Sequence, residues 1–338
     1  MPRISNEEGR RVDTVLITGG AGYIGSLLVS HLLNSGYRVI VFDKLCFGGE
    51  SLVHVWGREN FTFVRGDICS QDSLRQVFKL HPVDHVVHLA AIVGDPACAR
   101  QPELARKVNY DASITLLEMA LSRKVKRFVF ASTCSNYGKM SDAVGYVDES
   151  SPLAPVSLYA ELKVQVEKAI LNGLSRNGDF CPVCLRFSTV YGLSPRMRFD
   201  LTVNEFTKEL SLGRELHVFG KQFWRPYCHV QDFSQAIRLA LTSDPGKVAF
   251  NVYNVGSTEE NYQKSMVIEE IKKFIPDAKV SYIEKDEDPR DYRVSFDKIA
   301  SELGFHISKR VPDGIREIKQ LIDDRVLRDP DEPKYRNI

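Results

Sequence analysis

Short runs of apolar, often β-branched residues alternate along the first half of the chain with segments whose apolar residues recur at helical spacing. The runs predict strands over residues 15–17, 37–42, 61–64, 85–89, 127–130 and 182–187. The spacing predicts helices between them, over residues 26–33, 73–80, 102–121 and 155–174. Apolar strands that alternate with helices are typical of a parallel sheet buried on both faces. The pattern therefore predicts an α/β fold with a doubly wound, Rossmann-type parallel sheet.

The last third of the chain has longer loops, more charge and less regular spacing. It predicts helices over 201–212, 267–274 and 311–327, and a strand over 248–255. We expect a larger domain over 12–188, to which 226–256 returns, and a smaller C-terminal α/β domain over 189–328. The tail beyond Arg328 is rich in charge and proline, so we expect it to be extended or loosely held.

A glycine turn joins the first predicted strand to the first predicted helix. Its spacing is G-x-x-G-x-x-G, and strand, turn and helix together form the context of a dinucleotide site. Gly19 allows a tight turn, Gly22 lets the backbone approach a pyrophosphate, and Gly25 lets the helix pack close to the strand. The helix N-terminus offers free N–H groups to the phosphates. The residues expected at the cofactor here are Gly19, Gly22, Tyr23, Ile24 and Gly25.

An acidic residue ends the second predicted strand. Asp43 can accept hydrogen bonds from the ribose diol of NAD and would repel the 2′-phosphate of NADP, so we expect NAD. Lys44 follows directly and weakens that preference. The alternative is a solvated Asp-Lys turn with no ligand.

Composition and charge narrow the classes of partner. Charged residues make up 26% of the chain, hydrophobic residues 43%, and the net charge is +1. A net charge this small gives no overall electrostatic attraction for nucleic acid or an anionic membrane. Any anionic substrate must therefore be bound by individual arginines. No stretch approaches the roughly 20 apolar residues of a membrane span. Residues 1–11 are polar and lack the apolar core of a signal peptide, so we expect a cytoplasmic protein.

The seven cysteines are scattered, and we expect free thiols. Cys181 and Cys184 form a C-x-x-C pattern within a predicted strand, where residues i and i+3 point to opposite faces. No second pair stands at zinc-ligand spacing, so we expect no metal site.

Tyr159 and Lys163 lie one turn apart on a predicted helix. A nearby ammonium stabilises a phenolate, so Tyr159 is a candidate acid/base for a sugar hydroxyl. The hydroxyl-rich segment 130–138 leaves a strand at the ligand edge and can hold the substrate oxygen beside Tyr159. Because Y-x-x-x-K occurs often by coincidence, the alternative is a solvated helix face.

Six motifs follow one another in a characteristic order: the glycine turn, Asp43, Gly66-Asp67-Ile68, His88-Leu89-Ala90-Ala91, S-T-x-x-x-Y-G at 132–138 and Y-x-x-x-K at 159–163. Together they resemble the extended short-chain dehydrogenase/reductase family, in particular its nucleotide-sugar epimerases and dehydratases such as UDP-glucose 4-epimerase, over roughly residues 13–325. The resemblance implies an NAD-dependent enzyme with the catalytic residues Thr133, Tyr159 and Lys163, the last of which also holds the nicotinamide ribose. Further implied cofactor residues are Asp67, Ile68, Leu89, Ala90, Ala91 and Asn109.

The same resemblance implies a nucleotide-diphosphate sugar as substrate, bound by the smaller domain. The implied substrate residues are Ser135, Ser188, Thr189, Asn204, Arg225 and Arg293, of which the two arginines would grip the diphosphate. Members of the family often carry Asn where this chain has Thr189. Helices 102–121 and 155–174 would pair across a two-fold axis, so we expect a homodimer.

The reaction depends on the residues that follow Thr133. Relatives that dehydrate the sugar carry a Glu there as the C5 base, whereas this chain has Cys134 and Ser135, which disfavours a 4,6-dehydratase. We therefore expect a 4-epimerase that works through a 4-keto intermediate. Alternatives are a 4-keto-sugar reductase, or a C3/C5 epimerase-reductase with Cys134 as proton carrier. Cys134 could equally be a packing residue, and a non-catalytic NAD-binding sensor or scaffold would not need the intact triad.

Overall fold

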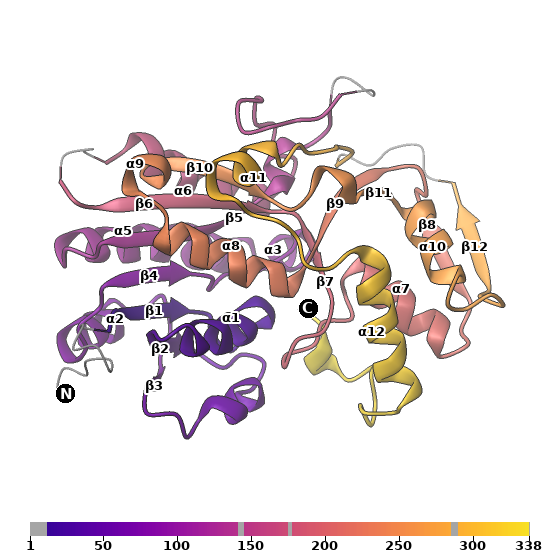
Figure 1. Cartoon of the computed structure of the whole chain (residues 1–338), viewed down its shortest axis with the longest axis horizontal. Coiled ribbons are helices and arrows are strands. Elements are labelled where there is room, and N and C mark those ends of the chain that lie inside the picture. The colour runs from indigo at the N-terminus through magenta and orange to yellow at the C-terminus, as the bar shows by residue number, and fades with distance from the viewer. Residues whose placement is uncertain (1–11, 141–144, 175–177, 285–289, 338) are drawn as a thin grey trace.

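The computed structural model describes residues 12–140, 145–174, 178–284 and 290–337, so the predicted polar arm over 1–11 lies outside the described residues (Figure 1). Its centre is a seven-stranded sheet in the order β10-β6-β5-β4-β1-β2-β3, in which every neighbouring pair is parallel. This confirms the predicted doubly wound sheet. The strands are β1 (Thr14–Thr18), β2 (Arg38–Asp43), β3 (Phe61–Arg65), β4 (His85–His88), β5 (Arg127–Thr133), β6 (Cys181–Phe187) and β10 (Asn251–Val255).

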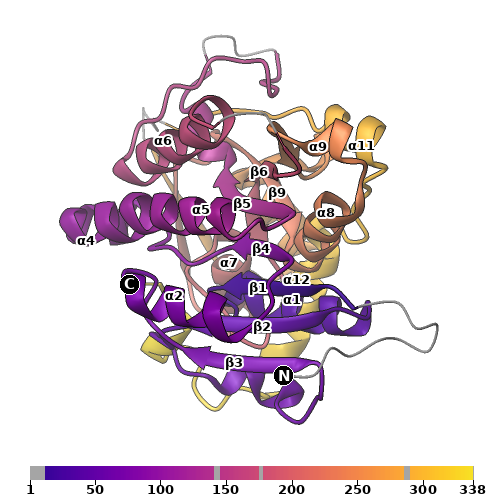
Figure 2. The same cartoon turned by 90° about the vertical axis from the view of Figure 1, so that its left-hand side faces the viewer.

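Alternate residues of each strand enter two separate hydrophobic cores. Val15 and Ile17 of β1 pack under α1 and α8, whereas Leu16 packs with α2, α5 and α6. Figure 2 shows these helices as layers on the two faces of the sheet. Strands buried on both faces must be apolar at nearly every position, which explains the continuous runs in the sequence. The helices that flank this sheet are α1 (Tyr23–Asn34), α2 (Gln71–Leu80), α3 (Asp95–Arg100), α4 (Pro102–Arg106), α5 (Ala112–Ser122), α6 (Leu158–Asn172), α8 (Val230–Thr242), α9 (Pro245–Val248) and α11 (Asp297–Leu303).

Two helices differ from their predicted form. The helix expected over 102–121 consists of α4 and α5, joined by a π-helical turn over Lys107–Asp111. The sequence analysis missed α8, although its buried Phe233, Ile237 and Leu241 follow helical spacing. Helix α8 packs against the large sheet and β10 pairs with β6 as a strand of it, so the chain returns to the large sheet after leaving β6.

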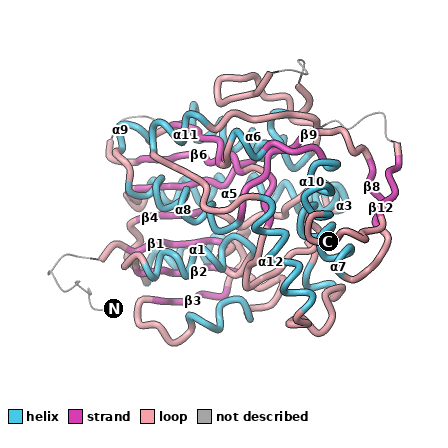
Figure 3. The backbone as a smooth tube through the Cα atoms, turned by 45° about the vertical axis from the view of Figure 1, so that its right-hand side comes forward, coloured by secondary structure: helices cyan, strands magenta, loops and turns pink. Residues whose placement is uncertain are grey.

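The smaller group of elements lies beyond the carboxyl ends of the large sheet (Figure 3). A three-stranded sheet has the order β11-β9-β7, and a two-stranded sheet pairs β12 with β8. Residues 292–305, which the sequence analysis assigned to 189–328, pack partly into the core of the large sheet. The elements of this group are β7 (Thr189–Tyr191), α7 (Thr202–Ser211), β8 (Leu216–Phe219), β9 (Trp224–His229), β11 (Asn261–Gln263), α10 (Lys264–Lys272), β12 (Val280–Ile283) and α12 (Val311–Asp323).

The C-terminal tail is held against α7, contrary to the expectation of a loose segment. Asp331 forms ion pairs with Lys208 at 2.5 Å and with Arg214 at 2.6 Å. The ring of Tyr335 packs edge-on against Phe199, whose N–H donates to the Tyr335 carbonyl. Compensated charge and aromatic contact together outweigh the entropy of a free tail.

The two thiols of the C-x-x-C pattern diverge: Cys181 enters the core under α1 and α8, and Cys184 the opposite core. All seven cysteines are free. Within the described part of the chain, none of the helices has the length and apolar character needed to cross a bilayer.

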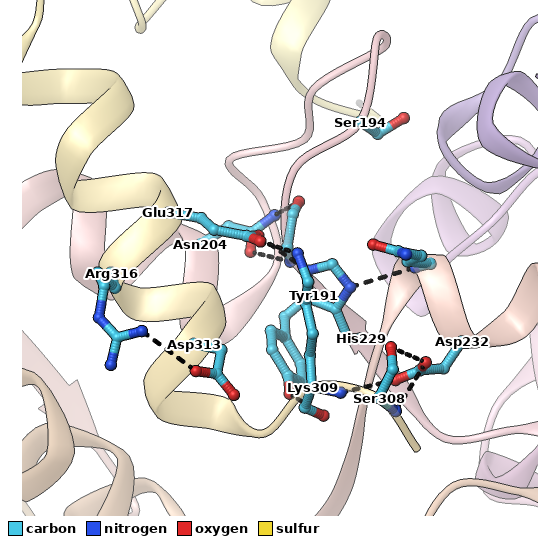
Figure 4. Close-up of polar contacts among 12 residues, drawn as sticks. Tyr191, Ser194, Asn204, His229, Asp232, Ser308, Lys309, Asp313, Arg316 and Glu317 are labelled. Atoms are coloured by element: carbon cyan, nitrogen blue, oxygen red, sulfur yellow. Dashed lines mark hydrogen bonds and ion pairs between the residues drawn. The ribbon is translucent and has the colours of Figure 1, made fainter. Parts of the chain in front are cut away.

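A half-buried cluster of polar and charged side chains joins α12 to the junction of β9 and α8 (Figure 4). His229 Nε2 lies 3.0 Å from Glu317 Oε2, and Lys309 also pairs with Glu317. Asp232, in the first turn of α8, accepts hydrogen bonds from the N–H and the hydroxyl of Ser308. Burial opposes ionisation of Glu317, but the hydrogen bonds from His229 and Lys309 outweigh it and lower its pKa to about 2.

We expect Glu317→Gln to lower the free energy of unfolding at pH 7 by roughly 1–3 kcal/mol, because it leaves His229 and Lys309 without their anion. Because the pKa of Glu317 is lower in the folded state, this stabilisation is fully present at pH values above the unfolded-state pKa of 4.5. It is lost as the pH falls toward the folded-state pKa of about 2. Urea unfolding at pH 7 and at lower pH measures both effects. The matched control is Glu269→Gln in an exposed pair with Lys272, which should change stability by less than about 0.5 kcal/mol. Equal losses in the two variants would contradict the expected role of Glu317.

Candidate active site

A cavity of about 750 Å³ opens at the carboxyl ends of the central strands. It lies where β1 is flanked by β2 on one side and β4 on the other, which is the point at which the order of the strands reverses. Open α/β sheets bind ligands at such switch points. Side chains and backbone from both the glycine turn and the smaller group of elements line the cavity.

The glycine turn forms a cradle that side chains could not share. A Cβ atom on Gly19 would lie 2.7 Å from the Ala90 nitrogen, and one on Gly25 would lie 2.3 Å from the Gly19 oxygen. Gly22 is the N-cap of α1; it supplies no side-chain cap, and the first turn of α1 has no acidic residue. The N–H groups and positive dipole of this turn are therefore available to a phosphate, and the cradle fits the pyrophosphate of a dinucleotide.

Asp43 lies at the edge of the cavity, as the sequence analysis predicted. Its two carboxylate oxygens accept hydrogen bonds from the N–H groups of Ala21 and Leu45, at 3.0 and 2.8 Å, and burial raises its pKa. Lys44 pairs with Asp67 at 2.8 Å, so its ammonium is already engaged by a carboxylate. The other cavity-lining residues expected on the cofactor side are Tyr23, Ile24, Ile68, Leu89, Ala90 and Ala91.

Thr133, Tyr159 and Lys163 line the same cavity. Thr133 ends β5, and the other two residues lie one turn apart on α6. Lys163 Nζ donates to the Ala131 carbonyl at 2.7 Å and lies 5.9 Å from the centre of the Tyr159 ring. The structure thus brings the three predicted catalytic side chains together from two elements.

The pKa of Tyr159 is raised, whereas a lowering by the nearby Lys163 was expected. Burial raises the pKa of Tyr159, and Cys98 and Asp95 nearby add to this, against a lowering by Arg198. Burial also lowers the pKa of Lys163 to about 8. The loss of hydration disfavours both charged forms, so the chain by itself keeps the phenol protonated.

A buried network lies behind the 132–137 segment, and the sequence analysis did not identify it. Glu167 on α6 forms an ion pair with Arg186 at 2.8 Å, and the two side chains are 2% and 4% exposed. The same carboxylate accepts hydrogen bonds from Ser132 and from Asn136. Because the Glu167 carboxylate is paired with Arg186 and bonded to Ser132 and Asn136, this network fixes the turn that follows Thr133.

Cys134 does not line the cavity, whereas the next residue, Ser135, does. The Cys134 side chain is 1% exposed, and its thiol donates to the Arg186 carbonyl at 3.2 Å. Burial raises its pKa well above the ordinary value, so a thiolate is strongly disfavoured there. Cys134 begins the 3-10 turn that follows β5, Cys134–Tyr137, and its thiol packs into the core. The structure therefore favours the alternative in which Cys134 is a packing residue over a thiol that faces the substrate.

The predicted binding residues divide into two groups. Ser188 and Thr189 line the cavity, but Asn109, Asn204, Arg225 and Arg293 do not. Asn109 instead exchanges hydrogen bonds with the backbone of Ile92 and so holds the loop after β4. Asn204 is fully buried and donates to the Tyr23 hydroxyl at 3.1 Å.

The two predicted arginines stack on aromatic rings outside the cavity. The guanidinium carbon of Arg225 lies 5.4 Å from the centre of the Tyr292 ring, and that of Arg293 lies 5.2 Å from the Trp224 ring. Residues 288 and 289 of the segment that suggested Arg293 lie outside the described residues.

Other arginines line the cavity, and the sequence analysis missed them: Arg100, Arg196, Arg198 and Arg290. Arg290 pairs with Asp95 at 2.7 Å, and Arg198 pairs with Asp200 at 2.6 Å. For Arg196 and Arg198 the sequence offers the alternating arginines in the loop after β7, and Arg290 lies in the same segment that suggested Arg293.

Comparison with known proteins gives consistent matches. Residues 15–256 match the NAD dependent epimerase/dehydratase family. The chain is 32% identical to a dTDP-glucose 4,6-dehydratase of Streptomyces niveus over 94% of this chain and 96% of the relative. It is also 32% identical to a UDP-glucose 4-epimerase of Halalkalibacterium halodurans, over 71% and 75% of the two chains. The crystal structure of Thermotoga maritima UDP-glucose 4-epimerase with UDP-glucose is similar at a TM-score of 0.81 and 27% identity, with coverage of 93% and 100%.

We predict that the protein binds NAD more tightly than NADP, because the Asp43 carboxylate lines the cavity at the end of β2, where it can accept hydrogen bonds from a ribose diol and would repel a 2′-phosphate, and because Asp67 engages Lys44. Calorimetry with both dinucleotides measures the preference. Asp67→Asn removes the carboxylate that pairs with Lys44 and should bring the affinities for NAD and NADP closer together. Equal affinities in the wild-type protein would contradict the assignment of Asp43.

Proposed function

The chain belongs to the NAD-dependent epimerase/dehydratase family, and on that premise we propose that it is a nucleotide-sugar 4-epimerase that acts through a 4-keto intermediate. The observation that carries the proposal is the placement of Thr133, Tyr159 and Lys163 in one cavity with the glycine turn. The two residues that follow Thr133 supply no carboxylate: they are a buried cysteine and a serine. This combination supports chemistry at C4 over elimination across C5 and C6.

The substrate class follows from the relatives and the arginines. The relatives compared above are named for UDP-glucose and dTDP-glucose, which supports a nucleoside diphosphate hexose. The cavity supplies guanidinium groups from Arg100, Arg198 and Arg290. Planar guanidinium forks match the oxygens of a diphosphate, and a net charge of +1 offers no other general attraction for one.

In the proposed mechanism the chain moves one proton and holds the sugar in place. When NAD is bound, it supplies the hydride acceptor and donor at C4 and a positive ring charge that favours the Tyr159 phenolate. Tyr159 takes the proton of the 4-hydroxyl as the C4 hydride leaves, and returns it when hydride is delivered to the other face. Thr133 orients the reacting oxygen, and Lys163 holds the nicotinamide ribose. The surrounding burial excludes water, so the proton stays between Tyr159 and the sugar.

The alternatives differ in what they need from this site. An epimerase-reductase with a cysteine proton carrier needs an accessible thiolate, and the buried, hydrogen-bonded Cys134 argues against it. A 4,6-dehydratase is the activity named for the relative with the wider coverage, but it needs a base where this chain has Ser135. A 4-keto-sugar reductase uses the same triad and is told apart by its products. A sensor or scaffold would not need the triad.

The preferred test combines a substrate panel with two variants. We expect the wild-type protein to interconvert C4 epimers of at least one nucleoside diphosphate hexose, without uptake of solvent deuterium at C3 or C5. Tyr159→Phe keeps the ring but removes the proton carrier, so turnover should fall by roughly 10²–10⁴-fold while NAD binding survives. Product analysis by NMR in deuterated water reads both results.

Cys134→Ala is the matched control from the neighbouring segment. Because the thiol points into the core, this change should leave turnover within about 3-fold. Incorporation of solvent deuterium at C5, together with formation of a 6-deoxy-4-keto sugar, would show that the activity is a dehydratase and not a 4-epimerase. Loss of deuterium uptake in Cys134→Ala would instead assign the thiol a catalytic role.

We further propose a homodimer built from α4, α5 and α6, the helices of one sheet face (Figure 2). Leu104 on α4 is 42% exposed and Leu121 on α5 is 40% exposed, which is consistent with a surface that a partner covers. Two-fold dimers are the most common closed assembly. Light scattering at micromolar concentration should give twice the 38.3 kDa mass of the chain, and a monomer mass would contradict the proposal.

A further inference from the structure

Arg196 is a buried cation in the cavity wall that belongs to none of the predicted motifs. It lies in the loop between β7 and α7, residues 192–201, and its side chain is only 6% exposed. It lines the same cavity as Gly22, Tyr23 and Gly25 of the glycine turn. A guanidinium group is costly to bury, so its partners decide what it does.

The 192–201 loop is fastened directly to the first turn of α1. The Ser194 hydroxyl donates to the Tyr23 carbonyl at 2.7 Å and lies 3.0 Å from the hydroxyl of Ser26. The Tyr23 hydroxyl in turn donates to the Gly192 carbonyl at 2.5 Å. The Arg196 N–H donates to the Ser194 hydroxyl oxygen at 3.4 Å. These contacts hold the backbone of Arg196 near the first turn of α1, and Arg196 lines the cavity together with the glycine turn.

The Arg196 side chain is oriented but not neutralised. Its guanidinium carbon lies 4.0 Å from the centre of the Phe47 ring, and Nη2 donates to the Arg336 carbonyl at 3.2 Å. Its Nε is buried and has no hydrogen-bond partner among the described residues. Arg198, two residues on, contrasts with it because Asp200 holds it through two hydrogen bonds. Stacking on a ring leaves the N–H edges of a guanidinium group open in its plane.

We propose that Arg196 binds the pyrophosphate of the dinucleotide, opposite the N-terminus of α1. The anion would lie between the open N–H groups of the glycine turn and the guanidinium edge, and would neutralise a charge that no described carboxylate pairs with. Burial, together with the like charge of Arg198, lowers the pKa of Arg196 to about 10, and a bound anion reverses that effect.

The C-terminal tail takes part in this arrangement. The Arg336 carbonyl holds Nη2 of Arg196, the Asn337 N–H donates to Asp200 at 3.3 Å, and Asn337 lines the cavity. The ion pairs of Asp331 anchor the tail to α7. A segment that the sequence analysis expected to be loose therefore supports the cation that faces the cofactor.

Binding measurements on the full chain, cleared of any dinucleotide carried through purification, test the proposal without turnover. Calorimetry compares NAD, ADP-ribose, adenosine and UDP on wild-type protein and on Arg196→Gln. We expect the variant to bind NAD and ADP-ribose roughly 10- to 100-fold more weakly, because both carry the pyrophosphate. Its affinity for adenosine and UDP should stay within about 3-fold of wild type.

Arg127→Gln is the matched control. Arg127 is similarly buried, at 8% exposure, but it begins β5 and so lies at the amino ends of the strands, away from the cavity at their carboxyl ends. This variant should bind all four compounds as the wild type does. Weaker UDP binding with unchanged NAD binding would assign Arg196 to the substrate diphosphate and overturn the proposal. Unchanged binding of every compound would also overturn it. If Arg196→Gln does not fold, Arg196→Lys decides: weaker binding of NAD and ADP-ribose supports the proposal, and wild-type affinity overturns it.

Discussion

The structure depends on one buried hydroxyl at the joint between the glycine turn and the smaller group of elements. The Tyr23 side chain follows the turn, donates to the Gly192 carbonyl and accepts from the Asn204 amide. The Asn204 carbonyl oxygen in turn accepts from the Gly192 N–H at 2.9 Å. A buried polar group without partners is costly, so each of these groups requires the other two. These bonds fix the position of the glycine turn relative to the smaller group of elements, so a ligand in the cavity contacts residues from both.

Burial is also what gives the site its chemistry. Lys163 and Tyr159 sit where their charged forms are disfavoured, while Glu167 and Arg186 behind them are buried as a satisfied pair. The Glu167–Arg186 pair fixes the geometry, whereas the protonation of Lys163 and Tyr159 responds to the charge of a ligand that enters the cavity. The same contrast appears in the wall, where Arg198 has its carboxylate and Arg196 does not. Ligand charge can therefore complete the electrostatics of the site.

The cofactor half of the site was predictable because its residues follow directly from the strands. Apolar runs buried on both faces define parallel strands, and the carboxyl ends of parallel strands meet at one edge. Gly19 after β1 and Ala90 after β4 are neighbours for that reason, and Asp43 after β2 joins them. Thr133 at the end of β5 and the Tyr159–Lys163 pair on α6 reach the same edge. Local pattern and sheet topology together were enough to place these residues.

The sequence by itself determined the alternating strands and helices, the glycine turn and the residues expected to carry the chemistry. Only the tertiary structure decided which arginines reach the cavity: Arg100, Arg196, Arg198 and Arg290 line it, whereas Arg225 and Arg293 lie over aromatic rings outside it. It also decided that Cys134 points into the core and that the C-terminal tail packs against α7. Strand and helix periodicity are local properties of the chain. The direction of a long side chain in a loop is set by partners distant in sequence, which no local pattern contains.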